Sequence, residues 1–257
     1  MSHQTILVEK KGNIGIIQLN RPKVLNAINR LMVDEIVEQM EAFDRDPDIR
    51  VIVLRGNDRA FAAGADIEEM MNDTPISFEL RDPFAVWDKM MLIKKPLIAS
   101  VNGYALGGGF ELALHCDLII AAEDAKFGFP EVKLGVLPGA GGTQYLTKLM
   151  GRTKAIEWLW LGEPMTAQEA AHYGIVNRIV HPKLVEEETM RFAERLSKQP
   201  PISLRLIKEA VNKAVDSPLR EGLQLERKNF YLAFDSKDQK EGMNAFVEKR
   251  APHFKGE

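Results

Sequence analysis

Three consecutive glycines join an apolar, strand-like segment to a helical pattern in the middle of the chain. The apolar segment covers residues 96–101, the glycines are Gly107, Gly108 and Gly109, and Glu111 follows in the first turn of the expected helix. Glycine at a helix start leaves N–H groups free to face an anion, which the helix dipole also favours. We predict an oxyanion-binding turn beside a carboxylate, suited to chemistry at a carbonyl group. The alternative is a tight turn followed by a helix-capping glutamate.

Composition narrows the class of protein. A chain of 257 residues with 45% hydrophobic content is long enough to bury a large core. The net charge of −3 argues against a partner such as nucleic acid. A single cysteine, Cys116, excludes an internal disulfide framework. Without an apolar run of membrane-spanning length or a targeting pattern at the start, we expect a cytoplasmic protein with no membrane partner.

Hydrophobic patterning predicts an α/β fold with a mostly parallel sheet. Apolar strand candidates alternate with helical patterns, which is typical of a sheet covered on both faces. We expect a core over residues 1–190 and a helical subdomain over residues 191–257. The strands are expected at residues 5–8, 14–19, 50–54, 96–101 and 117–122, and helices at 32–43, capped by Asn29, and at 84–93.

Three further stretches carry candidate site residues. Small residues in the 61–67 loop permit close backbone approach to a ligand, so the Ala65 N–H is a candidate second oxyanion donor, although the pattern also fits a tight turn. Glu131 follows a proline between apolar residues and supplies a second carboxylate. Burial is expected to raise the pKa of Glu131, whereas the helix dipole is expected to keep Glu111 ionised. The third stretch, residues 135–144, is a glycine-rich approach to another helix.

Motifs of other chemistries are missing from the sequence. The 135–144 stretch lacks the strand context and the later acidic residue of a dinucleotide fingerprint, which argues against a nicotinamide cofactor. The chain has no G-x-S-x-G elbow and no phosphate-binding loop ending in Gly-Lys-Ser/Thr. Its five histidines show no metal-ligand spacing, so no metal site is expected.

Taken together, these stretches resemble the crotonase superfamily, and in particular its enoyl-CoA hydratases. The resemblance runs from Asn20-Arg21-Pro22 to the segment 241–250, with the motifs in the family's order and spacing. It implies a spiral of ββα units with a helical C-terminal trimerisation subdomain, and a homotrimer or a dimer of trimers. It also implies an acyl-CoA substrate and no cofactor, because coenzyme A is part of that substrate.

The resemblance also implies roles for individual residues. Glu111 and Glu131 match the family's two catalytic glutamates, Ala65 and Gly108 its oxyanion hole, and Gly139 its water-positioning backbone. At Phe129 these hydratases often carry a polar or smaller apolar residue, which leaves acyl-chain specificity open. The positions that match coenzyme A contacts are Ala63, Ala65, Ile67, Phe230, Phe246 and Lys249.

The paired glutamates favour hydration, because water loses a proton as it attacks C3 and C2 gains one. Two alternatives within the family remain open: double-bond isomerisation, for which one glutamate is often enough, and hydration in aromatic-acid catabolism. RNA binding, found in a paralogue of this family, is the alternative from another class. It needs a basic helix, whereas Lys89, Lys94 and Lys95 are interleaved with Asp88 and apolar residues.

Overall fold

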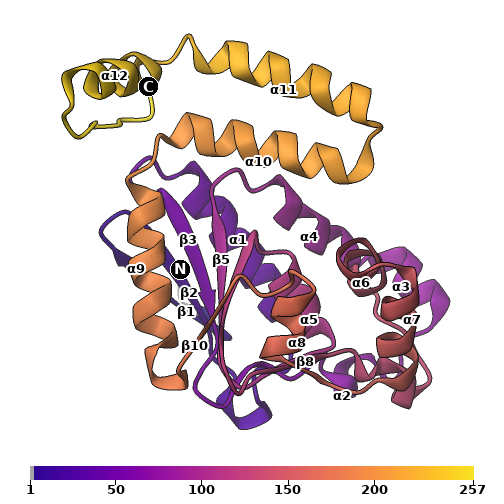
Figure 1. Ribbon diagram of the computed structural model, residues 1–257. Helices are drawn as coiled ribbons and strands as arrows, with labels where there is room; N and C mark the ends of the chain where they lie inside the picture. The colour runs from indigo at the N-terminus through magenta and orange to yellow at the C-terminus, as the bar shows by residue number, and fades with distance from the viewer. Residues whose placement is uncertain (1–2) are drawn as a thin grey trace.

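The chain builds two β-sheets from a repeated strand–strand–helix pattern (Figure 1). The computed structural model describes residues 3–257. In each repeat the first strand joins a six-stranded sheet and the second joins a four-stranded sheet, so the chain advances as a spiral. This is the expected spiral of ββα units. The paired strands are β3 (Val51–Arg55) and β4 (Ala60–Ala62), β5 (Leu97–Val101) and β6 (Tyr104–Leu106), and β7 (Leu118–Ala122) and β8 (Lys126–Gly128).

The remaining strands extend the two sheets. The larger sheet has the order β1-β2-β3-β5-β7-β10 and the smaller β4-β6-β8-β9. All neighbours pair in parallel except β1 with β2 and β8 with β9. The added strands are β1 (Ile6–Lys11), β2 (Ile14–Leu19), β9 (Met165–Thr166) and β10 (Arg178–Val180). The expectation for β1 stops too early, because exposed Glu9, Lys10 and Lys11 continue it as a charged edge strand.

Twelve α-helices cover and extend the sheets within residues 3–257. They are α1 (Arg30–Arg45), α2 (Ile67–Met70), α3 (Pro75–Arg81), α4 (Phe84–Asp88), α5 (Gly108–Leu114), α6 (Gly142–Met150), α7 (Arg152–Leu161), α8 (Ala167–His172), α9 (Val185–Ser197), α10 (Pro201–Asp216), α11 (Leu219–Ala233) and α12 (Lys237–Glu248). Short 3-10 turns lie at Pro22–Val24, Lys89–Leu92, Pro130–Leu134 and Pro182–Leu184. None of the described helices is long and apolar enough to cross a membrane.

Continuous apolar strands in the larger sheet follow from its two covered faces. Along β2, Ile14 and Ile16 face the cluster that includes Ala193 of α9, whereas Ile17 and Leu19 face the cluster that includes α1. Side chains alternate between faces along a strand, so a strand covered on both sides buries nearly every residue. The cluster that includes α1, which is the larger of the two, fixes the strands that lead into the site.

Helix α1 forms where the apolar spacing predicts it. The Asn29 side chain accepts the Met32 N–H at 3.1 Å, which confirms the expected cap. Met32, Ile36, Met40 and Phe43 recur along one face and are fully buried. Burial of each such side chain stabilises the fold by roughly 1.5–3 kcal/mol. The helix therefore fixes one face of the sheet.

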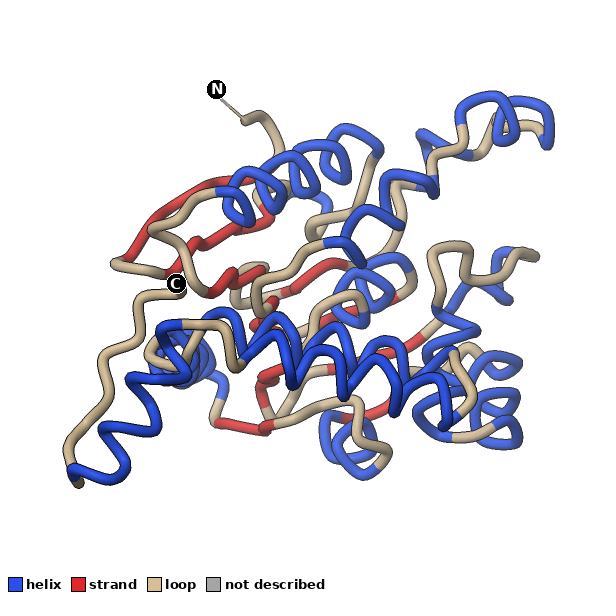
Figure 2. Tube along the Cα trace, turned by 90° about the horizontal axis from the view of Figure 1, so that it is seen from above, coloured by secondary structure: helices blue, strands red, loops and turns tan. Residues whose placement is uncertain are grey.

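The last three helices extend from the amino ends of the strands. Lys208 of α10 pairs with Asp117 at 2.8 Å, and Asp117 also accepts the Leu97 N–H where β5 begins. Figure 2 shows α10 and α11 running along each other, joined by a short turn. The expected boundary at residues 190/191 falls inside α9, which packs on the larger sheet. The helical C-terminal segment thus begins structurally with α10.

Candidate active site

The loop that follows β4 forms one side of the site. The Ile28 N–H donates to the Gly64 carbonyl at 2.8 Å, and the Asp66 N–H donates to the Ile28 carbonyl at 2.8 Å. In such a parallel pairing, the N–H of the intervening residue, Ala65, faces away from Ile28. Among residues 3–257 the Ala65 N–H has no acceptor. It is therefore a free donor beside the site.

The turn between β6 and α5 brings Gly108 against this loop. Gly107 adopts a φ of +50°, a left-handed conformation that glycine accepts without strain, and α5 begins at the next residue. A Cβ atom on Gly109 would lie 2.2 Å from the Ala62 carbonyl oxygen, so only glycine allows this approach. A Cβ atom on Gly108 would lie 3.6 Å from the Ala65 nitrogen. Within the described chain the Gly108 N–H has no acceptor either, so the two predicted oxyanion donors lie side by side.

Glu111 projects from the first turn of α5, and its side chain is buried. Its Oε1 atom accepts the Ala140 N–H at 2.7 Å and the Gly142 N–H at 2.8 Å. These donors belong to the glycine-rich stretch that leads into α6. A helix start with free N–H groups binds anions, and here the anion is the Glu111 carboxylate of the same chain. The two hydrogen bonds fix the orientation of the carboxylate.

Glu131 reaches the site from the 3-10 turn after β8. Its Oε1 atom lies beside Gly107, where an added Cβ would come within 2.7 Å of it. Its Oε2 atom is buried, with no hydrogen-bond donor in the described part of the chain. The carboxyl group of Glu131 thus lies against the turn that presents Gly108, and one of its oxygens is without a protein partner.

The two glutamates have different electrostatic surroundings. Burial raises the pKa of Glu131 to about 7, and the charge of Glu111 contributes to the rise. This agrees with the sequence-based expectation. Burial also raises the pKa of Glu111, although the N–H groups of Gly142 and Ala140 oppose the rise. The expectation that the helix dipole keeps Glu111 readily ionised is therefore wrong in direction, because the cost of burying the charge exceeds the stabilisation from these donors.

Gly139 lies one residue before the Ala140 donor and contacts an aromatic ring. A Cβ atom on Gly139 would lie 2.6 Å from Cζ of Phe84 in α4. The ring thus borders the loop that holds Glu111. The role of Gly139 in holding water stays a prediction.

Phe129, where the sequence leaves the acyl pocket open, packs into the core. It is 2% exposed, and its ring stacks on Phe110 with centroids 4.9 Å apart. A Cβ atom on Gly142 would lie 2.6 Å from the Phe129 Cζ atom, so the ring supports the start of α6 from behind. Phe84, by contrast, borders the loop that orients Glu111.

The predicted coenzyme A contacts divide into two groups. Ala63 lies on the same loop as Ala65, and Ile67 is the first residue of α2, which follows that loop. Phe230, Phe246 and Lys249 lie on α11 and at the end of α12, at the opposite end of the molecule from α2 (Figure 1). Within one chain the structure does not bring this second group to the site.

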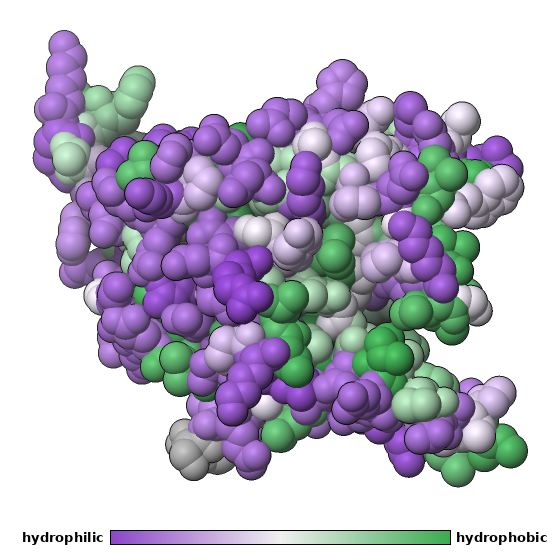
Figure 3. All heavy atoms as spheres, turned by 90° about the horizontal axis from the view of Figure 1, so that it is seen from below, coloured by the Kyte–Doolittle hydropathy of each residue, from purple (hydrophilic) through white to green (hydrophobic). Residues whose placement is uncertain are grey.

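Apolar side chains are exposed near the site. They include Leu80 on α3, Leu137 before α6 and Trp160 on α7. Figure 3 shows apolar side chains gathering toward the right of the view, the side on which α3, α6 and α7 lie in Figure 1. Such a surface suits contact with an apolar group.

The sequence did not identify three positions that contact site residues: Ala140, Gly142 and Phe84. The signal for the first two was present, because glycines before a helix leave N–H groups unpaired, but the sequence did not show that Glu111 is their acceptor. Phe84 carries no local signal, since its contact with Gly139 joins segments far apart in the chain.

Comparisons with known proteins point to one family. The family model described as "Enoyl-CoA hydratase/isomerase" matches residues 9–257. A crystal structure of "Enoyl-CoA Hydrates Subunit I" from Geobacillus kaustophilus HTA426 superposes with a TM-score of 0.98 and 63% identity over 100% of both chains.

Curated relatives match over comparable lengths. "Probable enoyl-CoA hydratase echA8" from Mycobacterium bovis is 48% identical over 99% of each chain. "2,3-dehydroadipyl-CoA hydratase" from Escherichia coli K12 is 40% identical over 98% of each. The chain belongs to the enoyl-CoA hydratase/isomerase family.

Proposed function

We propose that this protein is an enoyl-CoA hydratase, which adds water reversibly across the C2=C3 double bond of a trans-2-enoyl-CoA thioester to give a 3-hydroxyacyl-CoA. The observation that carries the proposal is the juxtaposition of a buried and a partly buried carboxyl group with two free backbone N–H groups. The names of full-length relatives support the same reaction.

The N–H groups of Ala65 and Gly108 are the proposed oxyanion hole. When water attacks C3, the electrons of the double bond shift toward the thioester, and negative charge collects on its carbonyl oxygen. Donors fixed in place before the reaction stabilise this charge, and loss of one such donor typically costs about 2.7–4 kcal/mol of transition-state stabilisation. Because both donors belong to the backbone, their side chains need no polar group.

The two glutamates divide the proton transfers in this proposal. Glu111, oriented by the Ala140 and Gly142 N–H groups, holds the water and takes its proton. Glu131, with a pKa of about 7, retains a proton near neutral pH and delivers it to C2. Gly139 is proposed to help hold the water through its backbone.

The proposed reaction is a redox-neutral addition. Water supplies the hydroxyl group at C3, and the proton that Glu111 takes from it replaces, through solvent, the proton that Glu131 gives to C2. Atoms and electrons therefore balance without an electron carrier. We therefore propose that the enzyme uses no metal and no redox cofactor, and that coenzyme A enters only as part of the substrate.

Crotonyl-CoA tests this function. We expect the purified protein to remove the ultraviolet absorbance of the conjugated thioester and to form a product heavier by one water. Unchanged absorbance and mass would contradict the proposal. With a 3-enoyl-CoA substrate, migration of the double bond without added water would favour the isomerase alternative.

We further propose that three copies assemble, as a homotrimer or a dimer of trimers. Phe230, Phe246 and Val247 are more than half exposed on α11 and α12, which is unusual for large apolar side chains on one surface. In a trimer these helices would pack on a neighbouring copy, and Phe230, Phe246 and Lys249 would reach its coenzyme A. Light scattering at micromolar concentration is expected to give a trimeric or hexameric mass, and a monomeric mass would contradict the assembly.

A further inference from the structure

The ring of Phe84 forms an aromatic wall beside the loop that orients Glu111. The Phe84 ring contacts Gly139, and the next residue, Ala140, donates its N–H to the Glu111 carboxylate. Ring and carboxylate are thus held by neighbouring residues of one loop. Phe84 remains 39% exposed, so its ring is not wholly packed into the core.

A second ring supports Phe84 from behind. Phe78 of α3 stacks on it with centroids 6.3 Å apart and ring planes within 6° of parallel. Stacked rings restrict each other's rotamers and add a modest attraction. The position of Phe84 therefore depends on how α3 is held.

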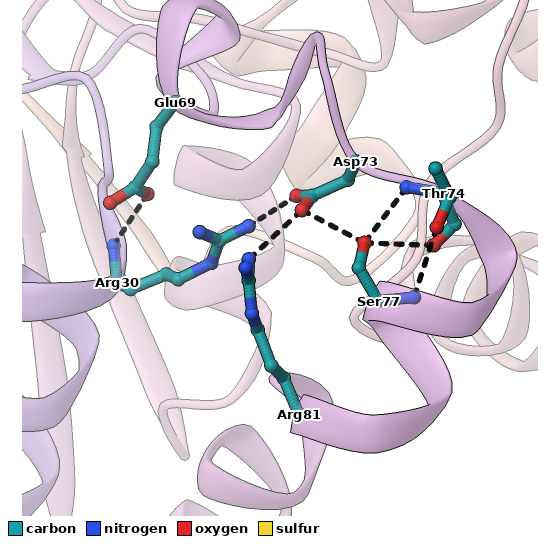
Figure 4. A network of polar contacts seen from close by, with 6 residues as sticks. All are labelled: Arg30, Glu69, Asp73, Thr74, Ser77 and Arg81. Atoms are coloured by element: carbon teal, nitrogen blue, oxygen red, sulfur yellow. Dashed lines mark hydrogen bonds and ion pairs between the residues drawn. The ribbon is translucent and has the colours of Figure 1, made fainter.

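A polar network holds α3 in place (Figure 4). The Asp73 carboxylate, whose side chain is 6% exposed, accepts hydrogen bonds from Arg30, Arg81 and Ser77. Thr74 and Ser77 cap the start of α3 through reciprocal hydrogen bonds. A buried carboxylate with three donors is costly to displace, so the Phe78–Phe84 pair has a fixed support.

The order of groups along the site sets the direction in which the acyl chain of the substrate extends. Ala65 and Gly108 would hold the thioester oxygen, and the glutamates would act at C2 and C3. Carbons beyond C3 then continue past Glu111 toward Gly139 and the Phe84 ring. We propose that Phe84 is a specificity-determining residue that restricts the substrate to short acyl chains. This inference rests on the proposed function, because it assumes an enoyl thioester in the site.

Binding of saturated acyl-CoAs tests the wall without requiring any hydration. Butyryl-CoA and decanoyl-CoA lack the double bond, so calorimetric titration reports binding alone. We expect the wild-type protein to prefer butyryl-CoA, and Phe84→Ala to shift the ratio of dissociation constants about tenfold toward decanoyl-CoA, since even one methylene in an apolar pocket changes discrimination by about tenfold or more. Phe84→Trp should shift the ratio the opposite way.

Controls separate this inference from the proposed function. Leu7→Ala removes an exposed apolar side chain from the edge strand β1 and should leave the ratio unchanged. Phe84→Leu serves as a milder variant if thermal unfolding shows that Phe84→Ala is unstable. The role of Phe84 would be overturned if the ratio stays within twofold of wild type both in Phe84→Trp and in Phe84→Ala, with Phe84→Leu replacing Phe84→Ala if the latter is unstable. This outcome would count against Phe84 even if crotonyl-CoA is hydrated. Conversely, a shifted binding ratio without hydration would uphold the wall and reject the proposed reaction.

Discussion

Glu111 and Glu131 face the same site, but among residues 3–257 only the Glu111 carboxylate accepts backbone N–H groups from a distant segment of the chain. The Glu111 carboxylate accepts two N–H groups from the start of α6, whereas one Glu131 oxygen is buried without a donor among residues 3–257. Since N–H donors stabilise a carboxylate and burial destabilises it, this difference favours Glu131 as the member of the pair that retains a proton more readily.

The pH dependence of hydration should follow the protonation of Glu131. Its pKa of about 7 means that the proposed proton donor is lost as the pH rises through neutrality. We predict that kcat/KM for crotonyl-CoA falls between pH 6 and pH 8, about tenfold per pH unit above the pKa. Initial rates in buffers of constant ionic strength measure this. A flat profile over that range would contradict the role of Glu131 as the acid.

The stability of the folded protein should also depend on the protonation of Glu131. The folded protein binds the Glu131 proton more tightly than the unfolded chain, whose pKa lies near the ordinary value of 4.5. Stability from the neutral group is present below pH 4.5 and is lost as the pH rises through about 7. Glu131→Gln should therefore match wild type in melting temperature near pH 4.5 and exceed it at pH 8. Calorimetric scans at both pH values measure the difference, and Glu9→Gln, an exposed change on β1, is the matched control.

Removal of one backbone donor should impair turnover with little loss of folding. Gly108 is the first residue of α5, a position where helices tolerate proline. Gly108→Pro deletes the N–H and should lower kcat about 10²–10³-fold, whereas Ala65→Ser keeps its N–H and should have a much smaller effect. Circular dichroism checks folding. Equal losses in the two folded variants would argue against backbone donors at these positions.

The contact between Gly139 and Phe84 predicts that a substitution of Phe84 restores activity lost by a substitution of Gly139. Gly139→Ala places a methyl group 2.6 Å from the Phe84 Cζ atom, so the ring or the loop holding Glu111 must move. We expect about a tenfold loss of kcat/KM, since small misplacement of catalytic groups is costly. Phe84→Ala in the same chain removes the clash and should restore most of the loss. The coupling energy from the four proteins of this double-mutant cycle measures the effect; additive losses would show that the two positions act independently.

Local patterns in the sequence predicted much of the fold. The Asn29 cap, α1 and the apolar strands β3, β5 and β7 depend on spacing and neighbours, and the structure places them within one or two residues of expectation. The split of each repeat between two sheets came only through the family resemblance, because periodicity does not specify which strands pair.

The site, like the fold, was predictable from the sequence only where it depends on local motifs. Gly108, Ala65, Glu111 and Glu131 lie in short motifs that the sequence displays, and the structure brings them together. The acceptor of the Ala140 N–H was not predictable, since the donor and Glu111 are 29 residues apart. The direction of the Glu111 pKa shift was also missed, because burial depends on packing from the whole chain.

Substitution of each glutamate tests the central claim most directly. Glu111→Gln and Glu131→Gln keep the size of the side chain but remove its ability to exchange a proton. Each should lower the hydration of crotonyl-CoA, followed by ultraviolet absorbance, about 10²–10⁴-fold, the usual contribution of one acid–base group, while Glu9→Gln leaves the rate unchanged. If either folded glutamine variant at the site hydrates crotonyl-CoA at the wild-type rate, the paired-carboxylate account is contradicted.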